Sequence, residues 1–550
     1  MKKGEISIGL VSETRFPDEG IIYRDDGKVK IKHCIPHQLI EYMITRKKEG
    51  NAKGRMIRVV EKSPLENVET PCIHSGICGG CLYQTVGYEN QLKIKEEQIL
   101  TLLKNATKDE FIWEGIKASP FEIGYRNKME YSFGDEYKDG PLALGMHKRG
   151  SHYDIVTTDE CKIVHEDFTQ ILKTTLEFFR NKNIPYFHKN THLGVLRHLI
   201  IRRSVYNKEL LINLVTTTQL GSEFEEVLRD WKEEILKLDS KIEAKVSGIL
   251  HTKNDSLADA VIDEGMSILY GNDFIVEKLL GLEFKISTFS FFQTNSLGAE
   301  VLYSVAGEYI GDTKGKSVYD LYSGTGTIAQ LLAKFAEEVY GVEIVEEAVD
   351  AARENAVRNG ILNCKFIAGD VLKIIDDLDR KPDIIILDPP RDGVHPKALP
   401  KIIDFNAEKI VYISCKPSSL ARDMEVLNAG GYHMVKACTV DMFPFTGNVE
   451  TVALLSKLDV DKHIDVEIKL DELDLTSAES KASYAQIKEY ILEKFDLKVS
   501  TLYIAQIKKK CGIVLREHYN KSKKEKQVIP QCTPEKEEAI MDALRHFKMI

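Results

Sequence analysis

Cys415 and Glu450 are the two side chains of this sequence whose type and setting best suit covalent catalysis. Cys415 ends an apolar run from Lys409 that predicts a buried strand, and Lys416-Pro417 follows it. A free cysteine is most often a small buried hydrophobe. However, a thiol at the carboxyl end of such a strand lies where open α/β sheets bind ligands, which favours a nucleophile. Glu450 leads into an apolar run that predicts an edge strand, and we expect it near the same cleft as a general base.

A carboxylate follows another apolar run. Residues 381–391 read Lys-Pro-Asp-Ile-Ile-Ile-Leu-Asp-Pro-Pro-Arg, which predicts a buried parallel strand that ends at Asp388. The two prolines fix the backbone after it. Because parallel strands bring their carboxyl ends to one edge of a sheet, we expect Asp388 and Arg391 to point into the same cleft.

A cofactor would be held by the elements of residues 317–343. A short buried strand runs into a turn at Gly324 and Gly326, where a residue without Cβ lets the backbone approach a ligand. A helix follows, and a second strand ends at Glu343, roughly 20 residues past the glycines, where a carboxylate can accept ribose hydroxyls. This pattern predicts a nucleotide-binding βαβ unit. Gly324-x-Gly326-x-x-Ala329 also fits the dinucleotide fingerprint, so NAD, or an ordinary glycine turn, remains an alternative at this point.

Three cysteines, Cys72, Cys78 and Cys81, are separated by five and then two residues, with glycines that let the backbone wrap around a bound centre. A fourth thiolate is needed to close the site, and the next cysteine is Cys161. Four thiolates suit either a 4Fe-4S cluster or zinc. Zinc usually takes paired Cys-x-x-Cys knuckles, and only one knuckle is present, which favours iron–sulfur. His74 lies within the loop and is expected to be a bystander.

Residues 287–295 read Ser-Thr-Phe-Ser-Phe-Phe-Gln-Thr-Asn. Phenylalanines are core residues in most settings, but Gln293 and Asn295 offer amide edges beside them. An aromatic face and an amide edge are what recognition of a flipped base requires, so this stretch is a candidate base site.

The chain of 550 residues exceeds what one hydrophobic core can support, so we expect three or four domains. A hydrophobic content of 43% and a charged content of 29% are ordinary for soluble globular proteins. The net charge of −10 argues against a uniformly basic nucleic-acid coat, but not against a local basic face. No apolar run is long enough to span a bilayer, and ten cysteines in this length do not suggest a disulfide scaffold. We therefore expect a cytoplasmic protein.

The overall pattern predicts a multidomain α/β protein. Residues 1–62 alternate apolar and polar side chains between turns, which predicts a small OB-like β-barrel with basic loops that suit RNA. Residues 63–285 predict a central α+β domain that holds the cysteines, with arginines that suit RNA phosphates. Residues 286–456 predict a Rossmann-like domain. Residues 457–550 predict an acidic linker and a basic helical extension that includes a basic loop at 521–526. This extension either adds RNA affinity or binds a partner.

In combination these motifs resemble the RNA uridine-5-methyltransferases, which use S-adenosyl-L-methionine to make 5-methyluridine in bacterial ribosomal and transfer RNA. The similarity covers about residues 5–456. In that family the ribosomal branch carries an N-terminal TRAM barrel and a 4Fe-4S cluster, and the transfer-RNA branch lacks both. The motifs that carry the resemblance are the Cys72/Cys78/Cys81/Cys161 set, Phe291-Phe-Gln293, the glycine turn, Asp388-Pro-Pro-Arg391, Ser414-Cys-Lys-Pro417 and Asn448-Val-Glu450.

The resemblance implies a role for each matched residue. Phe291 would stack on the flipped base, Cys415 would be the nucleophile and Glu450 the base, and the four cysteines would hold the cluster. Asn448 stands where the family usually has histidine, and Lys416 where asparagine is more frequent, so local pKa values are expected to differ. The cofactor contacts would be Gln293, Tyr322, Gly324, Gly326, Glu343 and Asp388.

The resulting expectation is methylation of C5 of a uridine in 23S ribosomal RNA by a monomeric enzyme. Attack of Cys415 on C6 would make C5 nucleophilic, and Glu450 would then remove the C5 proton. NAD chemistry is disfavoured because it leaves both residues without a role. Methylation of an exocyclic amine is disfavoured because an aromatic residue, not Arg391, follows the prolines in those enzymes. A transfer-RNA uridine methyltransferase and an RNA-binding assembly factor with an inactive methyltransferase domain remain alternatives.

Overall fold

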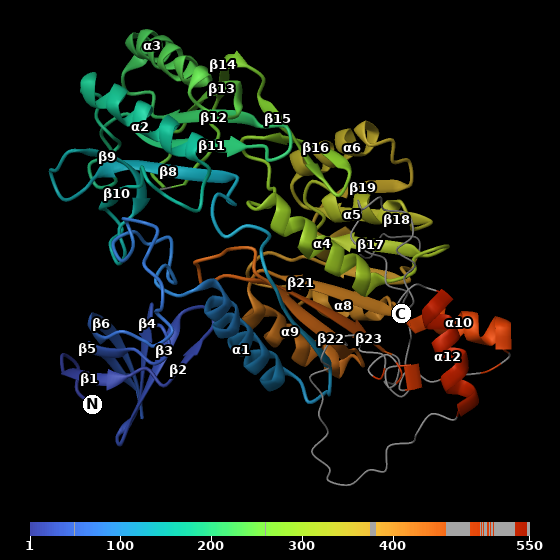
Figure 1. Ribbon diagram of the computed structural model, residues 1–550. Helices are drawn as coiled ribbons and strands as arrows, with labels where there is room; N and C mark the ends of the chain where they lie inside the picture. The colour runs from blue at the N-terminus through green and yellow to red at the C-terminus, as the bar shows by residue number, and fades with distance from the viewer. Residues whose placement is uncertain are drawn as a thin grey trace. The chain divides into compact units, whose positions relative to one another are not determined.

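The computed structural model describes residues 1–48, 50–258, 260–374, 381–457, 484–495 and 534–546, together with single residues between 497 and 510. The chain forms two compact units, Met1–Ile468 and Lys469–Ile550. Figure 1 traces the first unit from the N-terminal strands through a central sheet to a third, larger sheet. Within the described ranges, no helix has the length and apolarity needed to cross a membrane.

Six strands form the N-terminal sheet, in the order β1-β5-β6-β4-β3-β2. Neighbouring strands are antiparallel except for β4 and β6. The alternation in the sequence has its cause here, because side chains such as Val29, Ile31 and Tyr42 face a common core. The predicted N-terminal β domain is present as this sheet, and its closure into an OB-like barrel stays a prediction. The strands are β1 (Ile6–Leu10), β2 (Glu13–Arg15), β3 (Glu19–Arg24), β4 (Gly27–Lys32), β5 (Leu39–Lys48) and β6 (Asn51–Glu61).

The central sheet has seven strands in the order β10-β9-β8-β11-β12-β13-β14. Two helices pack on it through Phe168, Phe179 and Trp231, which are all buried. A hairpin of β15 and β16 follows, and its apolar side chains join the core of the next sheet. The elements are β8 (Lys128–Asp135), β9 (Leu142–His147), β10 (Ile155–Thr157), α2 (Glu166–Asn181), β11 (Leu196–Arg203), β12 (Glu209–Thr216), η1 (Gly221–Glu223), α3 (Phe224–Leu236), η2 (Lys237–Ser240), β13 (Lys245–Lys253), β14 (Met266–Gly271), β15 (Phe274–Leu279) and β16 (Leu282–Ser287).

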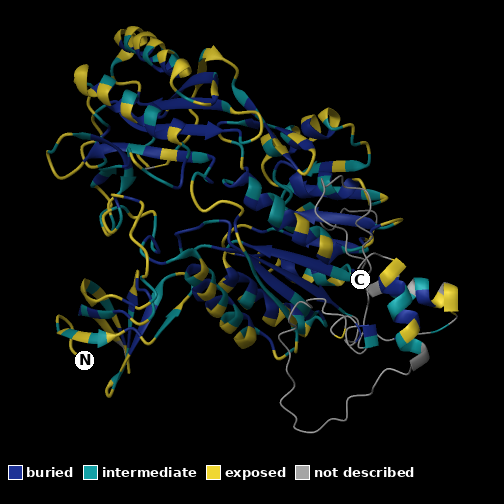
Figure 2. Cartoon of the chain, viewed as in Figure 1, coloured by how far each residue is buried: buried dark blue, intermediate teal, exposed yellow. Residues whose placement is uncertain are grey.

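The third sheet has eight strands in the order β19-β18-β17-β20-β21-β23-β22-β7. The first five are parallel, and helices cover both faces: α4, α5 and α6 share one core with the sheet, and α1, α8 and α9 share the other. The central strands β17, β20, β21 and β23 are buried almost throughout (Figure 2), which explains why they read as largely apolar runs. The elements are α1 (Tyr88–Ala106), β7 (Ile112–Lys117), α4 (Ser296–Ile310), β17 (Ser317–Leu321), α5 (Thr327–Ala333), β18 (Glu338–Glu343), α6 (Glu346–Arg358), β19 (Cys364–Ala368), α7 (Val371–Ile374), β20 (Ile384–Leu387), α8 (Ala398–Asp404), β21 (Lys409–Ser414), α9 (Pro417–Ala429), β22 (His433–Val440) and β23 (Glu450–Ser456).

Two features of this sheet differ from the sequence-based expectation. The run after Glu450 was expected at an edge, but β23 lies between β21 and β22 and is buried along its whole length. The edge beside β22 is instead formed by β7, from the range predicted for the central domain. Helix α1, from the same range, packs against α9. Residues 88–117 therefore form part of the third sheet and its helical cover, although the other strands of that sheet begin about two hundred residues later in the sequence.

The second unit contains two described helices, α10 (Tyr484–Phe495) and α12 (Pro534–His546). Ile487 and Ile491 of the first pack with Ile540 and Leu544 of the second in a small core of their own. The predicted helical extension is confirmed for these two segments. The predicted acidic linker beyond residue 457 and the basic loop at 521–526 lie outside the described residues.

Candidate active site

A cavity of about 1640 Å³ opens at the carboxyl edge of the parallel strands of the third sheet. The strand order reverses between β17 and β20, because β18 continues the sheet on one side and β20 on the other. Open α/β sheets bind ligands at such a switch point. Except for Gly326 and Asn295, every residue predicted for the site lines this cavity, and the residues come from the central domain as well as from the sheet.

The glycine turn forms as predicted after β17. Tyr322 and Ser323 donate their N–H groups to the Val342 carbonyl (2.9 Å each), and Tyr322 has a φ of 75°. Gly326 begins α5 in the left-handed conformation, and a Cβ at this position would lie 2.6 Å from the Phe366 ring. Only glycine therefore fits here without displacing the core beneath the turn.

Glu343 ends β18 beside this turn. One carboxylate oxygen accepts the N–H of Gly324 (3.0 Å) and the other accepts the N–H of Val345 (3.0 Å). Both bonds come from backbone, so the carboxylate is held at a fixed position on the cavity wall and keeps lone pairs for a ligand. The geometry is compatible with the predicted contact to ribose hydroxyls.

Two further carboxyl groups lie near the turn. Asp388 follows β20, and burial raises its pKa to about 7. Asp320 lies within β17, and burial and the charge of Asp388 raise its pKa to about 8. One Asp320 oxygen accepts the Ala329 N–H (3.0 Å), and among the described residues the other has no hydrogen-bond partner. Asp320 is not among the predicted site residues, although an acidic residue inside an otherwise apolar strand is a usable signal. A buried carboxyl group with an unpaired oxygen beneath a ligand turn fits a cofactor that carries positive charge.

The phenylalanine stretch connects β16 to α4. Phe292 packs against Phe284 with ring centroids 6.0 Å apart and is 6% exposed, whereas Phe291 lines the cavity and is 71% exposed. The backbone of this loop is held by a side chain from outside it. The guanidinium of the buried Arg202 donates to the carbonyls of Thr288 (3.0 Å) and Ser290. An unsupported apolar ring that faces a cavity is available to stack on a ligand.

The two amides next to this loop have different positions. Gln293 lines the cavity, and the Asn127 side chain donates to its backbone carbonyl (3.1 Å). Asn295 was predicted to read a base edge, but it is 2% exposed and caps α4 by accepting the Gly298 N–H (2.9 Å). Its amide nitrogen donates to Ser119 (3.1 Å) and to the Met442 carbonyl (3.0 Å). The prediction for Asn295 was wrong, because its hydrogen bonds are used within the fold.

Cys415 and Glu450 come together through the pairing of β21 with β23. These strands are antiparallel, with Ser414 opposite Thr451, so one further step places Cys415 opposite Glu450. Directly opposed residues point to the same side of a sheet. The thiol is half-buried and the carboxyl is 3% exposed, and both line the cavity.

The local charges and burial raise the pKa of both groups. Burial raises the pKa of the Cys415 thiol to about 11, and the charges of Glu450 and Asp388 act in the same direction. Burial and Asp388 hold the pKa of Glu450 well above its usual range. Arg391 lowers both values, so the predicted arginine lies close enough to influence both groups. The pair is suited to a thiol attack followed by proton removal by a strong carboxylate base.

Helix α9 holds the segment that carries Arg391. Ser419 donates its hydroxyl to the Arg391 carbonyl (2.7 Å), and Arg422 donates to the Asp392 carbonyl (2.6 Å). Asp423 accepts the Val394 N–H (2.9 Å). Pro417 opens this helix directly after the thiol, where a missing N–H costs nothing. The nucleophile and the arginine are therefore positioned by the same helix.

The four predicted cysteines line the far part of the same cavity. They influence one another, because burial and the charges of Cys161, Cys78 and Cys72 raise the pKa of Cys81 to about 12. A backbone N–H group points at one of the sulfurs, because Gly80 donates to Cys78 (3.4 Å). His74 is not a member of this set; its Nε2 accepts the Glu160 N–H (3.4 Å) and ties the two cysteine segments together.

The spacing of the sulfurs bears on which centre they fit. Around a single zinc ion, tetrahedral bonds of about 2.3 Å bring the sulfurs to about 3.8 Å from one another. Among the described residues, no three cysteine sulfurs lie within 4.8 Å of one another. The thiols are therefore not arranged at the spacing of a single zinc ion, and four thiolates are also the donor set of a 4Fe-4S cluster.

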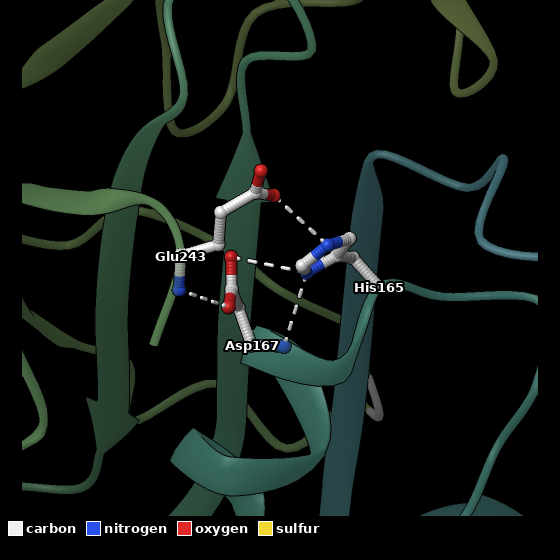
Figure 3. Close-up of side chains that lie close together, drawn as sticks. All are labelled: His165, Asp167 and Glu243. Carbon is white, nitrogen blue, oxygen red and sulfur yellow. Dashed lines mark hydrogen bonds and ion pairs between the residues drawn. The ribbon is translucent and has the colours of Figure 1, made fainter. Parts of the chain in front are cut away.

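His165, Asp167 and Glu243 form a second group of possible metal ligands (Figure 3). The imidazole lies between the two carboxylates, at 3.1 Å from Asp167 and 3.0 Å from Glu243. Arg203 pairs with both carboxylates, and Lys208 pairs with Glu243. Cations of the protein already occupy the lone pairs that a metal would need, so this group is an ion-pair network beside the N-terminus of α2.

The comparison with known families accounts for this combination of residues. The family model described as tRNA (Uracil-5-)-methyltransferase matches residues 87–458. The chain belongs to this family. It is an RNA methyltransferase that depends on S-adenosylmethionine. An uncharacterized RNA methyltransferase of Caldanaerobacter subterraneus subsp. tengcongensis is 48% identical over 457 residues, which is 83% of this chain and 100% of the relative. A second, from Clostridium tetani, is 48% identical over 459 residues, which is 84% of this chain and 99% of the relative.

A solved structure gives the same fold for this methyltransferase. The Pyrococcus abyssi tRNA (uracil-54, C5)-methyltransferase, in complex with S-adenosyl-L-homocysteine, is 27% identical, with a TM-score of 0.62. The match covers 82% of this chain and 99% of the archaeal one. The resemblance recognised in the sequence is therefore confirmed at the level of the family and of the cofactor. The family match ends at residue 458, so the second unit of this methyltransferase lies outside it.

Proposed function

We propose that this methyltransferase acts on C5 of a uridine in 23S ribosomal RNA, through a covalent bond between Cys415 and C6 of the base. The observation that carries the proposal is the register of β21 and β23, which makes Cys415 and Glu450 neighbours in one cavity with the glycine turn. Methylation of this ring carbon needs both side chains, because C5 of uracil is too weak a nucleophile until Cys415 has attacked C6, and Glu450 must then remove the C5 proton.

The reaction uses the two side chains in sequence. The Cys415 sulfur bonds to C6, and the electron pair of the C5–C6 double bond moves toward C5. S-adenosylmethionine supplies the methyl group that C5 takes up. Glu450 then accepts the C5 proton, the double bond re-forms, and the bond from Cys415 to C6 breaks. The raised pKa of Glu450 makes its carboxylate a stronger base for a carbon-bound proton.

The proposed cofactor site is the turn between β17 and α5, with Gly324 and Gly326 allowing close approach. Glu343 would accept the ribose hydroxyls, and Tyr322, Gln293 and Asp388 line the same part of the cavity. The partly exposed Asp388 carboxylate and the buried Asp320 would favour the positive charge of the bound cofactor. These assignments rest on the resemblance and on the shape and charge of the cavity.

The target uridine would leave its stack to enter the cavity, because Cys415 and the methyl donor must reach the ring from different sides. Phe291 is the proposed stacking partner, since its ring is exposed in the cavity while the adjacent Phe292 fills the core. The buried Arg202 supports the loop from behind, so the exposed ring is carried by a fixed backbone.

Cys72, Cys78, Cys81 and Cys161 are the proposed ligands of a 4Fe-4S cluster. The single Cys-x-x-Cys knuckle favours it over zinc, which usually takes paired knuckles. The proposed methyl transfer needs no electrons from a redox centre, so a structural role for the metal centre is favoured over a redox role.

Ribosomal RNA is proposed as the substrate because the cysteine set and the N-terminal sheet resemble features of the ribosomal branch of the family. The alternative substrate is transfer RNA, which the similarity to the Pyrococcus abyssi enzyme favours. The second unit adds a possible RNA contact, since residues 481–550 contain fifteen lysines and arginines and nine acidic residues. We propose a monomeric, cytoplasmic enzyme.

The experiment is methylation of unmodified 23S ribosomal RNA and of unmodified transfer RNA with labelled S-adenosylmethionine and anaerobically purified protein. Label in 5-methyluridine of 23S RNA, absent with Cys415→Ala, is the expected result. Label confined to transfer RNA would refute the ribosomal assignment and support the alternative. Bound cofactor without label in either RNA would refute the proposed reaction on both substrates.

A further inference from the structure

The loop that precedes the catalytic base, Glu450, is hydrogen-bonded to the segment that follows Cys81. We define the base loop as residues 441–449, which connect β22 to Glu450 at the start of β23. The carbonyl of Phe445 accepts two hydrogen bonds, from the N–H groups of Leu82 (2.7 Å) and Tyr83 (2.9 Å). These two residues directly follow Cys81. The end of the cysteine loop is therefore bonded to the middle of the base loop.

Phe445 lies at a strained position of this loop. Its φ is 65°, a left-handed conformation that costs a non-glycine residue energy and persists only where surrounding contacts enforce it. Its N–H donates to the side chain of Gln91 (2.8 Å), and Tyr125 donates its hydroxyl to the Pro444 carbonyl (3.0 Å). The side chain of Phe445 is 5% exposed and packs in the core of the central domain. The conformation of the loop is thus imposed by residues outside the third sheet.

A buried ion pair makes the second connection. Lys95, on α1, lies 2.7 Å from a carboxylate oxygen of Asp441 and 3.1 Å from the Phe443 carbonyl. The side chains are 1% and 0% exposed. Burial lowers the pKa of Lys95 and the charge of Asp441 raises it, so Lys95 depends on Asp441 to remain charged. The two residues are 346 positions apart in the sequence, and the pair ties the helix that follows the cysteine loop to the start of the base loop.

We propose that the cysteine site is the anchor of the catalytic base. The Leu82 and Tyr83 hydrogen bonds and the Lys95–Asp441 pair transmit the position of the Cys72–Cys81 loop to the base loop, and so determine where the Glu450 carboxylate lies. Lys95 is a positioning residue that acts through Glu450. This inference deepens the proposed function and rests on it, and it assigns the metal centre a structural role in one specific step of the reaction.

The chemistry distinguishes this role from a general loss of structure. Formation of the Cys415–C6 bond and of the C5–methyl bond does not require Glu450. Removal of the C5 proton does, and only after the proton has moved to Glu450 can the Cys415–C6 bond break. A displaced base therefore leaves the methylated RNA joined to the protein. A fold that no longer binds RNA forms no such species.

The test compares the wild-type protein with Lys95→Met and Cys81→Ser, and uses Lys93→Met as a matched control, because Lys93 lies on the exposed side of the same helix. Each protein is incubated anaerobically with labelled S-adenosylmethionine and a transcript of 23S ribosomal RNA. Denaturing gels separate the free methylated RNA from the covalent complex. Hydrogen exchange of a peptide covering residues 441–450 is measured on the proteins without RNA.

We expect the covalent complex to increase at least tenfold with Lys95→Met and with Cys81→Ser, with a KM for RNA within twofold of wild type. Exchange in residues 441–450 is expected to be at least tenfold faster in both variants and unchanged with Lys93→Met. The double variant Lys95→Met/Asp441→Asn, which leaves no unpaired buried charge, serves where the single variant does not fold, and the same results are expected from it.

Protection of residues 441–450 at the wild-type level in the Lys95 and Cys81 variants would overturn the inference. So would a fall in turnover without any increase in the covalent complex. Failure of the proposed function is a different result, in which the wild-type protein methylates neither RNA. Hydrogen exchange still reports the coupling in that case, because it needs no substrate.

Discussion

Replacement of Glu450 by glutamine is expected to speed attack by Cys415 while it abolishes turnover. The pKa of the thiol is raised to about 11 by burial and then by the charges of Glu450 and Asp388, and Arg391 opposes them. Glutamine has nearly the same shape as glutamate and no charge. The substitution therefore removes one of the groups that hold the proton on sulfur, and it also removes the base that resolves the covalent complex.

The size of the effect follows from the thiolate population. With a pKa of about 11, roughly one thiol in a thousand is ionised at pH 8. The rate of attack then rises tenfold for each pH unit. It rises only roughly three- to fourfold for each unit by which the pKa falls, because a less basic thiolate is also a weaker nucleophile. The pKa of Glu450 is itself raised, so the carboxyl is neutral at low pH and resembles glutamine there. The two pH profiles should coincide at low pH and separate once Glu450 ionises, because the titrations of the two groups are coupled.

The assay measures formation of the covalent complex in a single turnover, between pH 7 and 9.5, on RNA that contains 5-fluorouridine. Fluorine at C5 cannot leave as a proton, so the complex persists in the wild-type protein as well as in Glu450→Gln. Arg391→Leu is the control of opposite sign, because loss of its charge raises the pKa of Cys415 and should move the profile to higher pH. Slower attack by Glu450→Gln than by wild type above pH 8 would refute this reasoning, and so would faster attack by Arg391→Leu.

Three further predictions concern other parts of the protein. Gly326→Ala should weaken cofactor binding, because a left-handed alanine costs roughly 1–2 kcal/mol and its Cβ would meet the Phe366 ring. Calorimetric titration with S-adenosyl-L-homocysteine checks this, and an unchanged affinity would contradict it. Phe291→Ala should lower kcat/KM by a factor equivalent to roughly 1–3 kcal/mol, because its stacking on the base is lost, and should leave the melting temperature unchanged. Phe292→Ala should instead lower the free energy of unfolding by roughly 3–5 kcal/mol. Deletion after Leu458 should weaken RNA binding and reduce its salt dependence, measured by titration at several salt concentrations; identical slopes would exclude an RNA contact by the second unit.

Several parts of this architecture followed from local sequence alone. Strands that are buried on both faces are predominantly apolar, so β17, β20 and β21 could be located from their apolar runs. The turn at Gly326 could be predicted because no other residue adopts its conformation in that space. Cys415 could be proposed as a nucleophile because parallel strands bring their carboxyl ends to one edge.

Local sequence also identified the two helices of the second unit. Their apolar residues recur at helical spacing, and both helices bury that face against each other. The same periodicity could not predict which face of the phenylalanine stretch is buried. Phe291 and Phe292 are adjacent and chemically identical, and only the packing of Phe292 on Phe284 leaves the other ring in the cavity.

The tertiary structure decided what depends on contacts between distant segments. Strand β23 lies inside the sheet because β21 pairs with it on one side and β22 on the other. The edge beyond β22 is formed by β7, a partner more than three hundred residues away that no local pattern encodes. The sequence could not exclude Asn295 from the base site, because its hydrogen-bond partners, Ser119 and Met442, come from other parts of the chain. Lys95 looked like one of many helix lysines until its pairing with Asp441 placed it in the interior. The sequence alone thus determined the reactive groups and the strands that carry them, because each depends on neighbouring residues. The fold decided their mutual position, since long-range pairing and burial determine which groups meet.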